Sequence, residues 1–550
     1  MNKIYIVLLT MLCSGILLAQ DPTVGLLDYS QSQTYQGYIL IYPHNQPDVF
    51  LLDNCGEIVH TWEGEEGFRP GNVAELLEDG RLVRTRRPAV FATDPIWAGG
   101  GGAIIDILSW EGDILWSYEL NNEEARLHHD IAVTPSGTIL AIAWEYISAE
   151  EAIAAGRDSA LLTQGALWPD MVIELDPELD SIIWEWHSWD HIVQDRDPSK
   201  PNFGVISENQ RKIDVNWDTS DGAADWHHMN SIDYNPVLDQ VMLSVPTFNE
   251  IWVIDHTTTT EQAATSNGGL TNHGGDLIYR AGNPQAYQQG DSTDQLLYYQ
   301  HDAHWVLNFP ENHPLYGDIA CFNNRVGADF STAEVFDSPW MDYLTDYQMF
   351  QETWPPYEFE NTITHPTPQN MYSTGLSSVQ FLPNGNTLLC SGRQGYLFEL
   401  NDEDEIVWEY ITPLIAGAPV EQGTELSLNN NLTFRAYKYS EDYPAFVGRD
   451  LTPKGWIEIN PLEDYCEDLI SSVAATAADA TLYPNPADGL VTVKWTTGMM
   501  IDISITNISG QQVIHTSGNG GTAYIDISDL HPGMYFITVD NEMSRKLIVK

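Results

Sequence analysis

Basic side chains are scarce in this 550-residue sequence, which has 23 Lys and Arg against 79 Asp and Glu and a formal net charge of −56 at pH 7. Binding to nucleic acid requires a basic surface, so this composition argues against nucleic acid as a natural partner. Acidic patches also bind Ca²⁺, but the sequence has no D-x-D-x-D-G loop. Solubility in a salty medium, where self-repulsion is screened, is the simpler explanation of the acidity.

Long apolar runs are absent after the first 20 residues. Residues 1–20 begin with a short basic segment, continue with a mostly apolar stretch from Ile4 to Leu18, and end at Ala19-Gln20. This pattern predicts a secretory signal peptide. No later stretch approaches the roughly 18 apolar residues of a membrane helix, so we expect no membrane span.

Cysteine is also rare. Beyond the predicted signal peptide the sequence contains Cys55, Cys321, Cys390 and Cys466. Their wide spacing includes no C-x-x-C metal-binding pair and fits disulfides and free thiols equally well. We therefore expect neither a metal nor another cofactor.

Extended helical patterns are few. The best covers Ser148 to Leu162, where Ser148 and Glu151 have the spacing of a capping box ahead of an Ala-rich run. Aromatic residues make up 11% of the chain, and Gly and Pro are scattered along it. This composition favours strands and tight turns, so the sequence predicts an all-β protein.

A degenerate repeat runs from residue 21 to about residue 465. Its first half is a turn followed by a strand, as in Pro135–Leu140, and its second half is an acidic turn followed by an aromatic strand, as in Gly112–Tyr118 and Glu405–Tyr410. Alternation within each strand gives each sheet an apolar face, so several sheets must pack face to face. We predict a six-bladed β-propeller over residues 21–465. A pair of β-sandwiches is the rival architecture, but it does not explain the repeated Gly-to-Trp spacing.

Residues 481–550 form a separate unit. Leu482–Ala487, Ile505–Val513 and Leu530–Val539 alternate strands with turns, which predicts a small C-terminal β-sandwich. These segments resemble the C-terminal sorting domain of the Bacteroidetes type IX secretion system. The resemblance implies the type IX secretion machinery as a partner and a secreted or cell-surface location. The small residues Ala474–Ala478 indicate a linker, which we place at 466–480.

Three histidine-led segments each run into a strand of the repeat. They are Leu127–Ile131, Trp226–Asp233 and Gln300–Trp305. If the repeated units circle a common axis, histidines that are far apart in sequence converge at one end of it. The candidates for an active site are therefore His129, His228, His301 and His304.

The histidine segments also belong to a longer ordered set of motifs that resembles the arylsulfotransferase family. The other members of the set are Asp276–Pro284, Phe322–Arg325, Tyr372–Cys390 and Trp408–Tyr410. The resemblance implies an enzyme that transfers a sulfuryl group from a phenolic sulfate to a phenol through a histidine nucleophile, without a nucleotide sulfate donor. By position, His228, His301 and Arg325 match active-site residues of the family. The implied small-molecule partners are phenolic sulfates and phenols.

These residue types suit sulfuryl transfer, which passes through a loose transition state with charge on the equatorial oxygens. An imidazole that is neutral near pH 7 is a competent nucleophile, and the guanidinium of Arg325 can hold two sulfate oxygens. One departure from the family lies at Thr374-Gly375-Leu376, near which many relatives have a further histidine. Either the nucleophile is one of His228, His301 and His304, or this branch has altered or lost the reaction.

Two other functions fit parts of the sequence. A non-catalytic cell-surface propeller that binds aryl or glycan ligands is favoured by the absent histidine. A quinone-dependent propeller dehydrogenase is suggested by Gly-x-x-x-Trp strands such as Gly112 to Trp116, but the sequence has no vicinal Cys-Cys pair.

Overall fold

The structure is a computed structural model. It describes residues 21–90, 94–342, 345–350, 352–476, 481–494, 501–507, 511–518, 522–539 and 543–550. The predicted signal peptide, residues 1–20, lies outside the described residues. The chain divides into two compact units, the first covering most of residues 21–462 and the second residues 463–550 together with Tyr29–Ser32.

Six antiparallel sheets of four or five strands form the first unit, which confirms the all-β prediction. In chain order, the first three sheets are β5 (Phe68–Leu76), β6 (Leu82–Pro88), β7 (Ile104–Leu108) and β8 (Ile114–Glu119); β9 (Ala125–Val133), β10 (Ile139–Glu145), β13 (Asp170–Asp176) and β14 (Ser181–His187); and β17 (Ser231–Asn235), β18 (Gln240–Val245), β19 (Glu250–Asp255) and β20 (Tyr279–Ala281).

The other three sheets continue the same pattern. They are β21 (His301–Trp305), β22 (Ile319–Asn323), β23 (Thr332–Phe336) and β26 (Asn361–Ile363); β27 (Ser378–Phe381), β28 (Thr387–Ser391), β29 (Tyr396–Leu400), β30 (Ile406–Ile411) and β1 (Gly25–Tyr29); and β33 (Thr433–Ser440), β2 (Gly37–Pro43), β3 (Val49–Leu52) and β4 (Ile58–Trp62).

Short strands and helices lie in the connections within and between the six sheets. They are β11 (Ile147–Ser148), β12 (Ala166–Leu167), β15 (Ile192–Val193), β16 (Ile213–Asp214), β24 (Trp340–Met341), β25 (Asp346–Tyr347), β31 (Leu414–Ile415), β32 (Ala418–Pro419), α1 (Ala149–Ala154) and α2 (Thr260–Ala263). Helix α1 begins at the predicted capping box of Ser148 and Glu151 but is shorter than the pattern suggested. None of the helices within the described ranges is long and apolar enough to cross a membrane.

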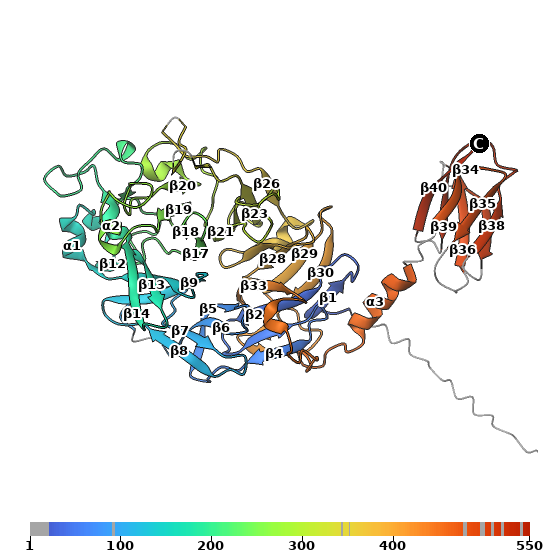
Figure 1. The fold of residues 1–550 in the computed structure, drawn as a ribbon, viewed down its shortest axis with the longest axis horizontal. Coiled ribbons are helices and arrows are strands. Elements are labelled where there is room, and N and C mark those ends of the chain that lie inside the picture. Colours follow the sequence, from blue (N-terminus) through green and yellow to red (C-terminus); the bar gives the residue numbers. More distant parts are fainter. Residues whose placement is uncertain are drawn as a thin grey trace, which may run out of the picture. The chain divides into compact units, whose positions relative to one another are not determined.

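The first strand of each sheet lies at the middle of the first unit. Strands β5, β9, β17, β21, β27 and β33 contact one another in this cyclic order, and β33 returns to β5. Figure 1 shows five of these labelled around the middle of the unit, with β4, β8, β14, β20 and β26 at its periphery. Residues just before or early in each inner strand are therefore brought to a common end of the unit.

Inner strands of neighbouring sheets are joined through aspartate side chains. Each carboxylate accepts a backbone N–H of the next inner strand, which satisfies an edge donor that has no ladder partner. The acceptor–donor pairs are Asp130 with Ile232 at 3.1 Å, Asp233 with Trp305 at 2.8 Å, and Asp302 with Val379 at 2.9 Å.

The last sheet of the unit combines strands from both ends of its sequence. Strand β33 pairs with β2 in a register that places Gly37 opposite Ser440 and Ile41 opposite Ala436. Strand β1 is likewise added to the sheet of β27–β30. The cyclic arrangement is therefore completed by pairing of early and late segments.

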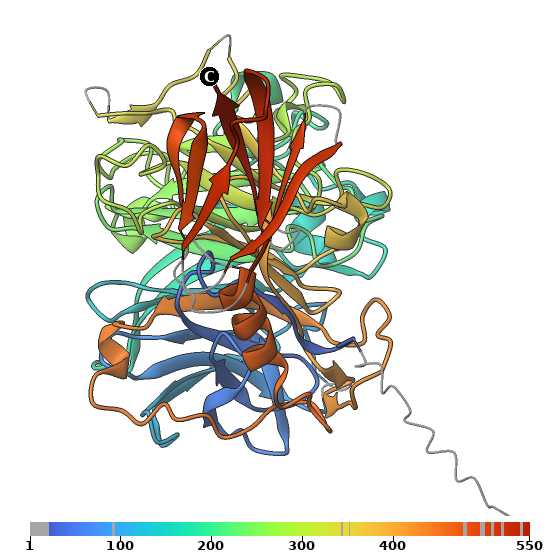
Figure 2. The same ribbon diagram turned by 90° about the vertical axis from the view of Figure 1, so that its right-hand side faces the viewer.

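The second unit consists of helix α3 (Tyr465–Thr476) and seven strands. In sheet order the strands are β37 (Gln512–Gly518), β36 (Ile501–Asn507), β39 (Gly533–Val539), β40 (Met543–Val549), β34 (Thr481–Asp488), β35 (Leu490–Lys494) and β38 (Thr522–Asp526). Figure 2 shows these strands, in orange-red to dark red, side by side. One apolar core takes Val491 and Ile525 from β35 and β38 and Ile505 and Ile537 from β36 and β39. The segment predicted as a linker begins within α3.

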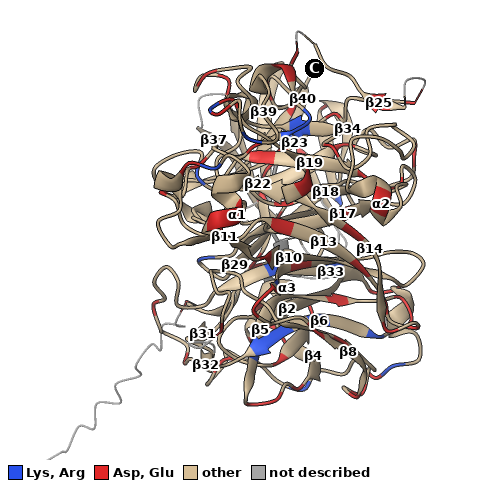
Figure 3. Ribbon diagram, turned by 90° about the vertical axis from the view of Figure 1, so that its left-hand side faces the viewer, with Lys and Arg blue, Asp and Glu red and all other residues tan. Residues whose placement is uncertain are grey.

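The distribution of charged residues and the state of the cysteines agree with the expectations from the sequence. Figure 3 shows acidic residues distributed over strands and loops on the face it draws, with few Lys and Arg among them. Cys55 and Cys466 are disulfide-bonded, whereas Cys321 and Cys390 are free and buried. The cysteines therefore divide between the two alternatives that their spacing left open.

Candidate active site

Three of the predicted histidines come together at one end of the inner strands. His129 lies in β9, His228 just before β17, and His301 at the start of β21. The ring centroids of His129 and His228 are 4.5 Å apart. The ring of Tyr299 lies 6.1 Å from His228 and 6.0 Å from His301, and Phe434 lies 6.3 Å from both His129 and His301. We refer to these three histidines as the histidine cluster.

The structure does not bring His304 to this cluster. His304 lines a cavity of about 440 Å³ to which all six inner strands contribute, through Glu75, Ile131, Asp233, His304, Val379 and Tyr437 among others. At the wall of this cavity Arg435 forms ion pairs with Asp130 at 2.7 Å and Asp302 at 2.8 Å. A bulge lies between the two histidines: Asp302 has a φ of 56°, and the pairing of β21 with β22 shifts register between His301 and His304.

His301 is held as a neutral imidazole with a defined tautomer. Its Nδ1 lies 2.8 Å from Asn324 Oδ1 and 3.3 Å from the Tyr299 carbonyl, and both of these are acceptors. Asn324 is oriented because its Nδ2 donates to the carbonyls of Ser373 and Leu376. The hydrogen-bond network therefore assigns the proton to Nδ1 and the lone pair to Nε2. Burial lowers the pKa of His301 to about 3.

His228 has the opposite electrostatic character. Its Nδ1 lies 2.5 Å from Asp225 Oδ2, and the other carboxylate oxygen accepts from Trp144 Nε1 at 2.9 Å. Burial opposes protonation, but the charge and hydrogen bond of Asp225 outweigh it and raise the pKa of His228. An imidazole whose pKa is lowered and one whose pKa is raised are thus placed at one site, a pairing suited to proton transfer.

The two His-His sequences repeat one arrangement. The first histidine of each pair, His128 or His227, contacts the buried carboxylate of Asp170, at 2.6 Å and 3.4 Å respectively. The second, His129 or His228, has a left-handed backbone with φ of 51° or 54°. This conformation is uncommon for residues other than glycine and turns the second imidazole toward the cluster.

His129 is neutral and linked to His128. Their Nδ1 atoms lie 2.8 Å apart, so one ring donates a hydrogen bond to the other. Burial lowers the pKa of His129 well below its ordinary value. Both rings are thus held by buried neighbours, His128 by Asp170 and His129 by His128.

The Gly99–Gly102 segment lies against the cluster. A Cβ on Gly100 would be 2.0 Å from His129 Nε2, and one on Gly99 would be 3.8 Å from His228 Cε1. Gly100 also has a φ of 77°, and its carbonyl accepts from His129 N at 2.8 Å. The tetraglycine is therefore a close-packed wall of the site and needs glycine at position 100.

Two arginines border the cluster near the segment that lacks the family histidine. Arg325 stacks on the Tyr299 ring at 3.5 Å and donates from Nε to the Thr374 carbonyl at 2.9 Å. Arg393 Nη2 lies 3.3 Å from the position of a Cβ on Gly375, and that position is 3.6 Å from His301 Cε1. The Nε of Arg393 is buried without an acceptor among the described residues. The site thus combines two guanidinium groups with three imidazoles, a set suited to an anion with several oxygens.

Four residues that contact or border the histidine cluster were not predicted from the sequence: Asp225, Asp170, Arg393 and Gly100. Asp225 stands three residues before His228, so an acid adjacent to the histidine segment was a visible signal. The others reach the cluster only through folding of distant segments. Asn324, which precedes the predicted Arg325, contacts His301.

The histidine cluster does not have the geometry of a metal site. Within the part of the chain that the structure describes, one group of three His, Cys, Asp or Glu residues has donor atoms all within 4.8 Å of one another, and it is Asp318, Asp337 and Glu360.

Solved structures with similar folds have low similarity to this chain. A protein of unknown function from Bacteroides caccae has 9% identity and a TM-score of 0.39, covering 74% of this chain and 100% of its own. A putative 6-phosphogluconolactonase from Bacteroides fragilis has 10% identity and a TM-score of 0.34, covering 75% and 100%. A streptogramin B lyase has 10% identity and a TM-score of 0.34, covering 77% and 96%. At these values the similarities carry no information on activity, and no curated protein matches the chain.

Family-level comparison is more specific. The secretion system C-terminal sorting domain matches residues 481–550, in agreement with the type IX resemblance of the tail. Such a domain indicates secretion to the cell surface or beyond. The arylsulfotransferase (ASST) family matches residues 27–413, which is more than half of the chain. On this basis, and with its histidine and arginine site at one end of the inner strands, the chain belongs to the arylsulfotransferase family.

Proposed function

We propose that this protein is an exported aryl-sulfate sulfotransferase that moves a sulfuryl group from a phenolic sulfate to a phenolic acceptor, with His301 as the nucleophile. The observation that carries the proposal is the hydrogen bond from His301 Nδ1 to Asn324, which leaves a lone pair on Nε2 of a neutral imidazole. Nucleophilic catalysis by histidine requires this state.

In the first half-reaction, His301 Nε2 attacks sulfur while the bond between sulfur and the phenolic oxygen breaks. His228, whose pKa is raised by Asp225, gives a proton to the departing phenolate. In the second half-reaction, neutral His228 accepts the proton of the acceptor phenol, whose oxygen attacks sulfur as the bond from sulfur to nitrogen breaks. The enzyme returns to its starting state with no net loss of protons.

Arg325 and Arg393 contribute positive charge where the equatorial oxygens of the transferring group gather charge. Arg325 is exposed, whereas His129 and His301 are buried, so an anion entering past the arginines reaches the imidazoles. Preorganised charge of this kind is usually the largest single contribution to such catalysis. In this proposal the two guanidinium groups border the segment where many relatives have a histidine.

The fold proposed for this reaction is a six-bladed β-propeller followed by a β-sandwich. The cyclic contacts of the six inner strands support six blades, and the core shared by β35, β38, β36 and β39 supports the sandwich. We further propose that residues 1–20 direct export, that residues 21–465 carry the activity, and that 466–480 connect them to the sorting domain. His304 has no role in the transfer.

The test is to mix the purified chain with p-nitrophenyl sulfate, with and without a simple phenol. Acceptor-dependent release of nitrophenolate, with a gain of one sulfuryl group on the peptide containing His301 when the acceptor is omitted, is the expected result. Release that does not depend on the acceptor would instead indicate hydrolysis.

A second function, a non-catalytic ligand-binding propeller at the cell surface, is favoured by one observation. Leu376, in the segment where many relatives have a histidine, has a left-handed φ of 63°, the conformation that His129 and His228 also have. An apolar side chain therefore stands at the kind of position that holds an imidazole elsewhere in the cluster. Absence of turnover from folded protein that still binds phenolic sulfates would establish it.

A further inference from the structure

The cavity that His304 lines lies apart from the histidine cluster and takes no part in the proposed transfer. Its volume is about 440 Å³, and residues of all six inner strands line it, so we call it the central cavity. Pro135 and Pro236, which follow β9 and β17, are exposed and also line it, so the cavity opens to solvent beyond the ends of these strands. Sites for small molecules typically have volumes of about 300–1,000 Å³, so the central cavity is large enough to hold a ligand.

Acidic side chains outnumber basic ones at the central cavity. Glu75, Asp233 and Asp302 line it, whereas Arg435 is the one Lys or Arg among its described lining residues. Arg435 is paired with Asp302 at 2.8 Å and with Asp130 at 2.7 Å. The described lining therefore leaves no guanidinium or ammonium group for Glu75 or Asp233, and the cavity favours a positively charged ligand.

Glu75 is the lining residue whose polar group is least satisfied. Its side chain is partly buried and has neither a hydrogen-bond donor nor an ion-pair partner among the described residues. Asp233, by contrast, accepts the backbone N–H of Trp305 at 2.8 Å. Burial, with Asp130 nearby, raises the pKa of Glu75 to about 7, the direction expected of a carboxyl group that lacks a cation. A cation in the cavity would supply the partner that the chain itself does not provide.

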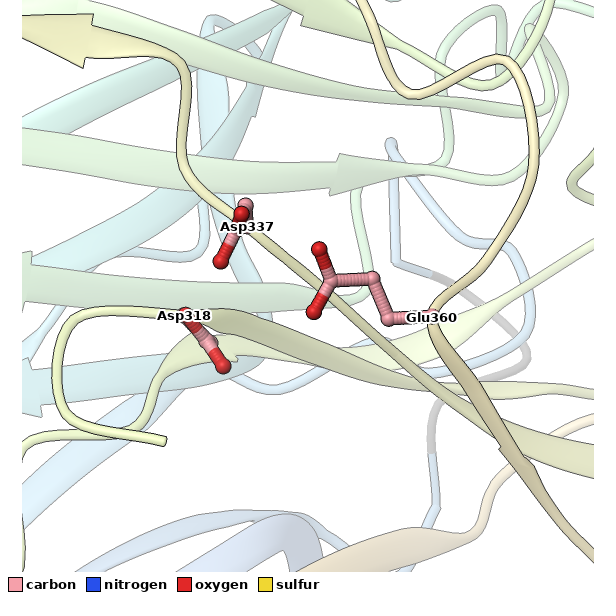
Figure 4. A group of neighbouring side chains, drawn as sticks. All are labelled: Asp318, Asp337 and Glu360. Atoms are coloured by element: carbon pink, nitrogen blue, oxygen red, sulfur yellow. The ribbon is translucent and has the colours of Figure 1, made fainter. Parts of the chain in front are cut away.

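The spacing of the acidic groups does not suit a metal ion. Within the described ranges, one set of three His, Cys, Asp or Glu side chains has donor atoms all within 4.8 Å of one another. That set is Asp318, Asp337 and Glu360, shown in Figure 4, and it does not line the central cavity. The carboxylates of the cavity and His304 are therefore spaced too widely to form a metal site with three protein ligands.

Aromatic and aliphatic side chains form much of the remaining wall. They include Ile131, Val133, Tyr234, Leu307, Phe381 and Tyr437. Apolar walls bury the body of a small molecule, while a few convergent polar groups fix its orientation. The face of a tyrosine ring also attracts an ammonium group. The lining therefore matches a molecule that has one cationic end and an apolar remainder.

We propose that the central cavity binds a small primary amine whose ammonium group pairs with Glu75. Asp233, whose negative charge acts on Glu75, adds to the attraction for the ammonium group. The apolar body of the amine lies against the aromatic and aliphatic wall and extends toward the mouth, where Pro135 and Pro236 form an apolar rim. Binding is non-covalent and uses no residue of the histidine cluster, so this site is additional to the proposed sulfuryl transfer.

The test is calorimetric titration of the full chain with phenethylamine, in slightly alkaline buffer in which Glu75 is ionised. Phenethyl alcohol is the matched probe, because it has the same apolar body without the charge. All titrations are made at one ionic strength, since a net charge of −56 attracts any cation weakly. We expect phenethylamine to bind at least about tenfold more tightly than phenethyl alcohol.

Two variants locate the binding site. Glu75→Gln keeps the shape of the side chain but removes its charge, and Asp233→Asn keeps an oxygen that can accept from Trp305. Each should weaken the binding of phenethylamine by about tenfold and leave that of phenethyl alcohol nearly unchanged. Glu78→Gln, on an exposed acid in the turn after β5, is the matched control and should bind phenethylamine as wild type does.

Glu75→Gln should fold, because Glu75 has no partner among the described residues to lose, and if it does not fold, Asp233→Asn decides the question. Equal affinities for the two probes in wild type, or equal weakening in Glu75→Gln and Glu78→Gln, would overturn the proposal. Saturable binding of CaCl₂ that displaces phenethylamine would overturn it in favour of a metal ion. These readouts measure binding and not turnover, so their outcome is independent of whether sulfuryl transfer is observed.

Discussion

His301 Nδ1 donates to Asn324 Oδ1 across 2.8 Å, and this contact joins the first residue of β21 to the residue after β22. Because Nδ1 carries the proton of this neutral imidazole, the lone pair of His301 lies on Nε2 and is available to attack a substrate.

Two histidines of β21 form a matched pair for mutagenesis. His301→Ala removes the proposed nucleophile, so acceptor-dependent release of nitrophenolate should fall by about 10³-fold or more. His304→Ala changes a side chain of the same type on the same strand that lines the cavity instead, and its kcat should stay within about twofold of wild type. Equal losses of activity in the two variants would mean that both substitutions act by disturbing strand β21, not by removing a nucleophilic imidazole.

The protonation of His228 predicts one limb of the pH profile. Its pKa in the folded protein is raised, so the proton that it gives to the leaving phenolate is present below that pKa and is lost as pH rises through it. Activity should therefore fall on the alkaline side. In Asp225→Asn the pKa of His228 drops, and the alkaline limb should move to lower pH by about one unit or more. A pH–rate profile of kcat that does not move would exclude His228 as the proton donor.

The two arginines should act together. Arg325→Ala and Arg393→Ala should each lower kcat/KM by about 10²-fold, because each removes preorganised charge at the transferring group. The double variant should lose less than the product of the two single losses, since both guanidinium groups serve one anion. Arg81→Ala, on an arginine paired with Asp79 in a surface turn, is the control and should be unaffected.

Glycine at position 100 is tested against glycine at position 137. Both have positive φ, of 77° and 86°, but a Cβ at Gly137 meets nothing within 4 Å whereas one at Gly100 meets His129 Nε2 at 2.0 Å. Gly137→Ala should cost about 1–2 kcal/mol in the free energy of unfolding and spare turnover. Gly100→Ala should cost more and also displace His129, so kcat should fall as well. Denaturant unfolding and kinetics on both variants separate the backbone strain of a positive φ from the steric contact of the new Cβ with His129.

Arg435 predicts a large stability effect at the cavity. It is buried between Asp130 and Asp302, so Arg435→Met leaves two carboxylates without their cation and should cost about 3–5 kcal/mol. Denaturant unfolding measures the loss. The triple variant that also carries Asp130→Asn and Asp302→Asn should recover part of it, and failure to recover any would show that packing of the arginine stem is the main contribution.

Much of this architecture follows from local sequence. Alternation and turn residues predict the strands, and because the inner strands run in one direction, histidine segments that precede them must converge. His129, His228 and His301 therefore meet as predicted. The resemblance to the arylsulfotransferase family placed Arg325 beside them, and the structure locates it against Tyr299 next to His301.

The remaining features depend on interactions that no local pattern specifies. His304 lies three residues beyond His301, across a bulge at Asp302, and lines the cavity between the inner strands instead of joining the cluster. Gly100 packs on His129, and this contact joins the loop between β6 and β7 to strand β9 of the next sheet. Arg393 follows β28 with no histidine nearby in sequence, so only the fold reveals its position near His301.

The pairing of β33 with β2 sets the order in which this protein becomes functional. Strand β2 is made early and has no inner partner until residues 433–440 have been synthesised. Before that point Phe434 is missing from beside His129 and His301, and Arg435 is missing from between Asp130 and Asp302. A chain still emerging from the ribosome or from a membrane translocon therefore carries the three histidines of the cluster but no assembled site, so the proposed transfer requires a first unit that has been completely delivered.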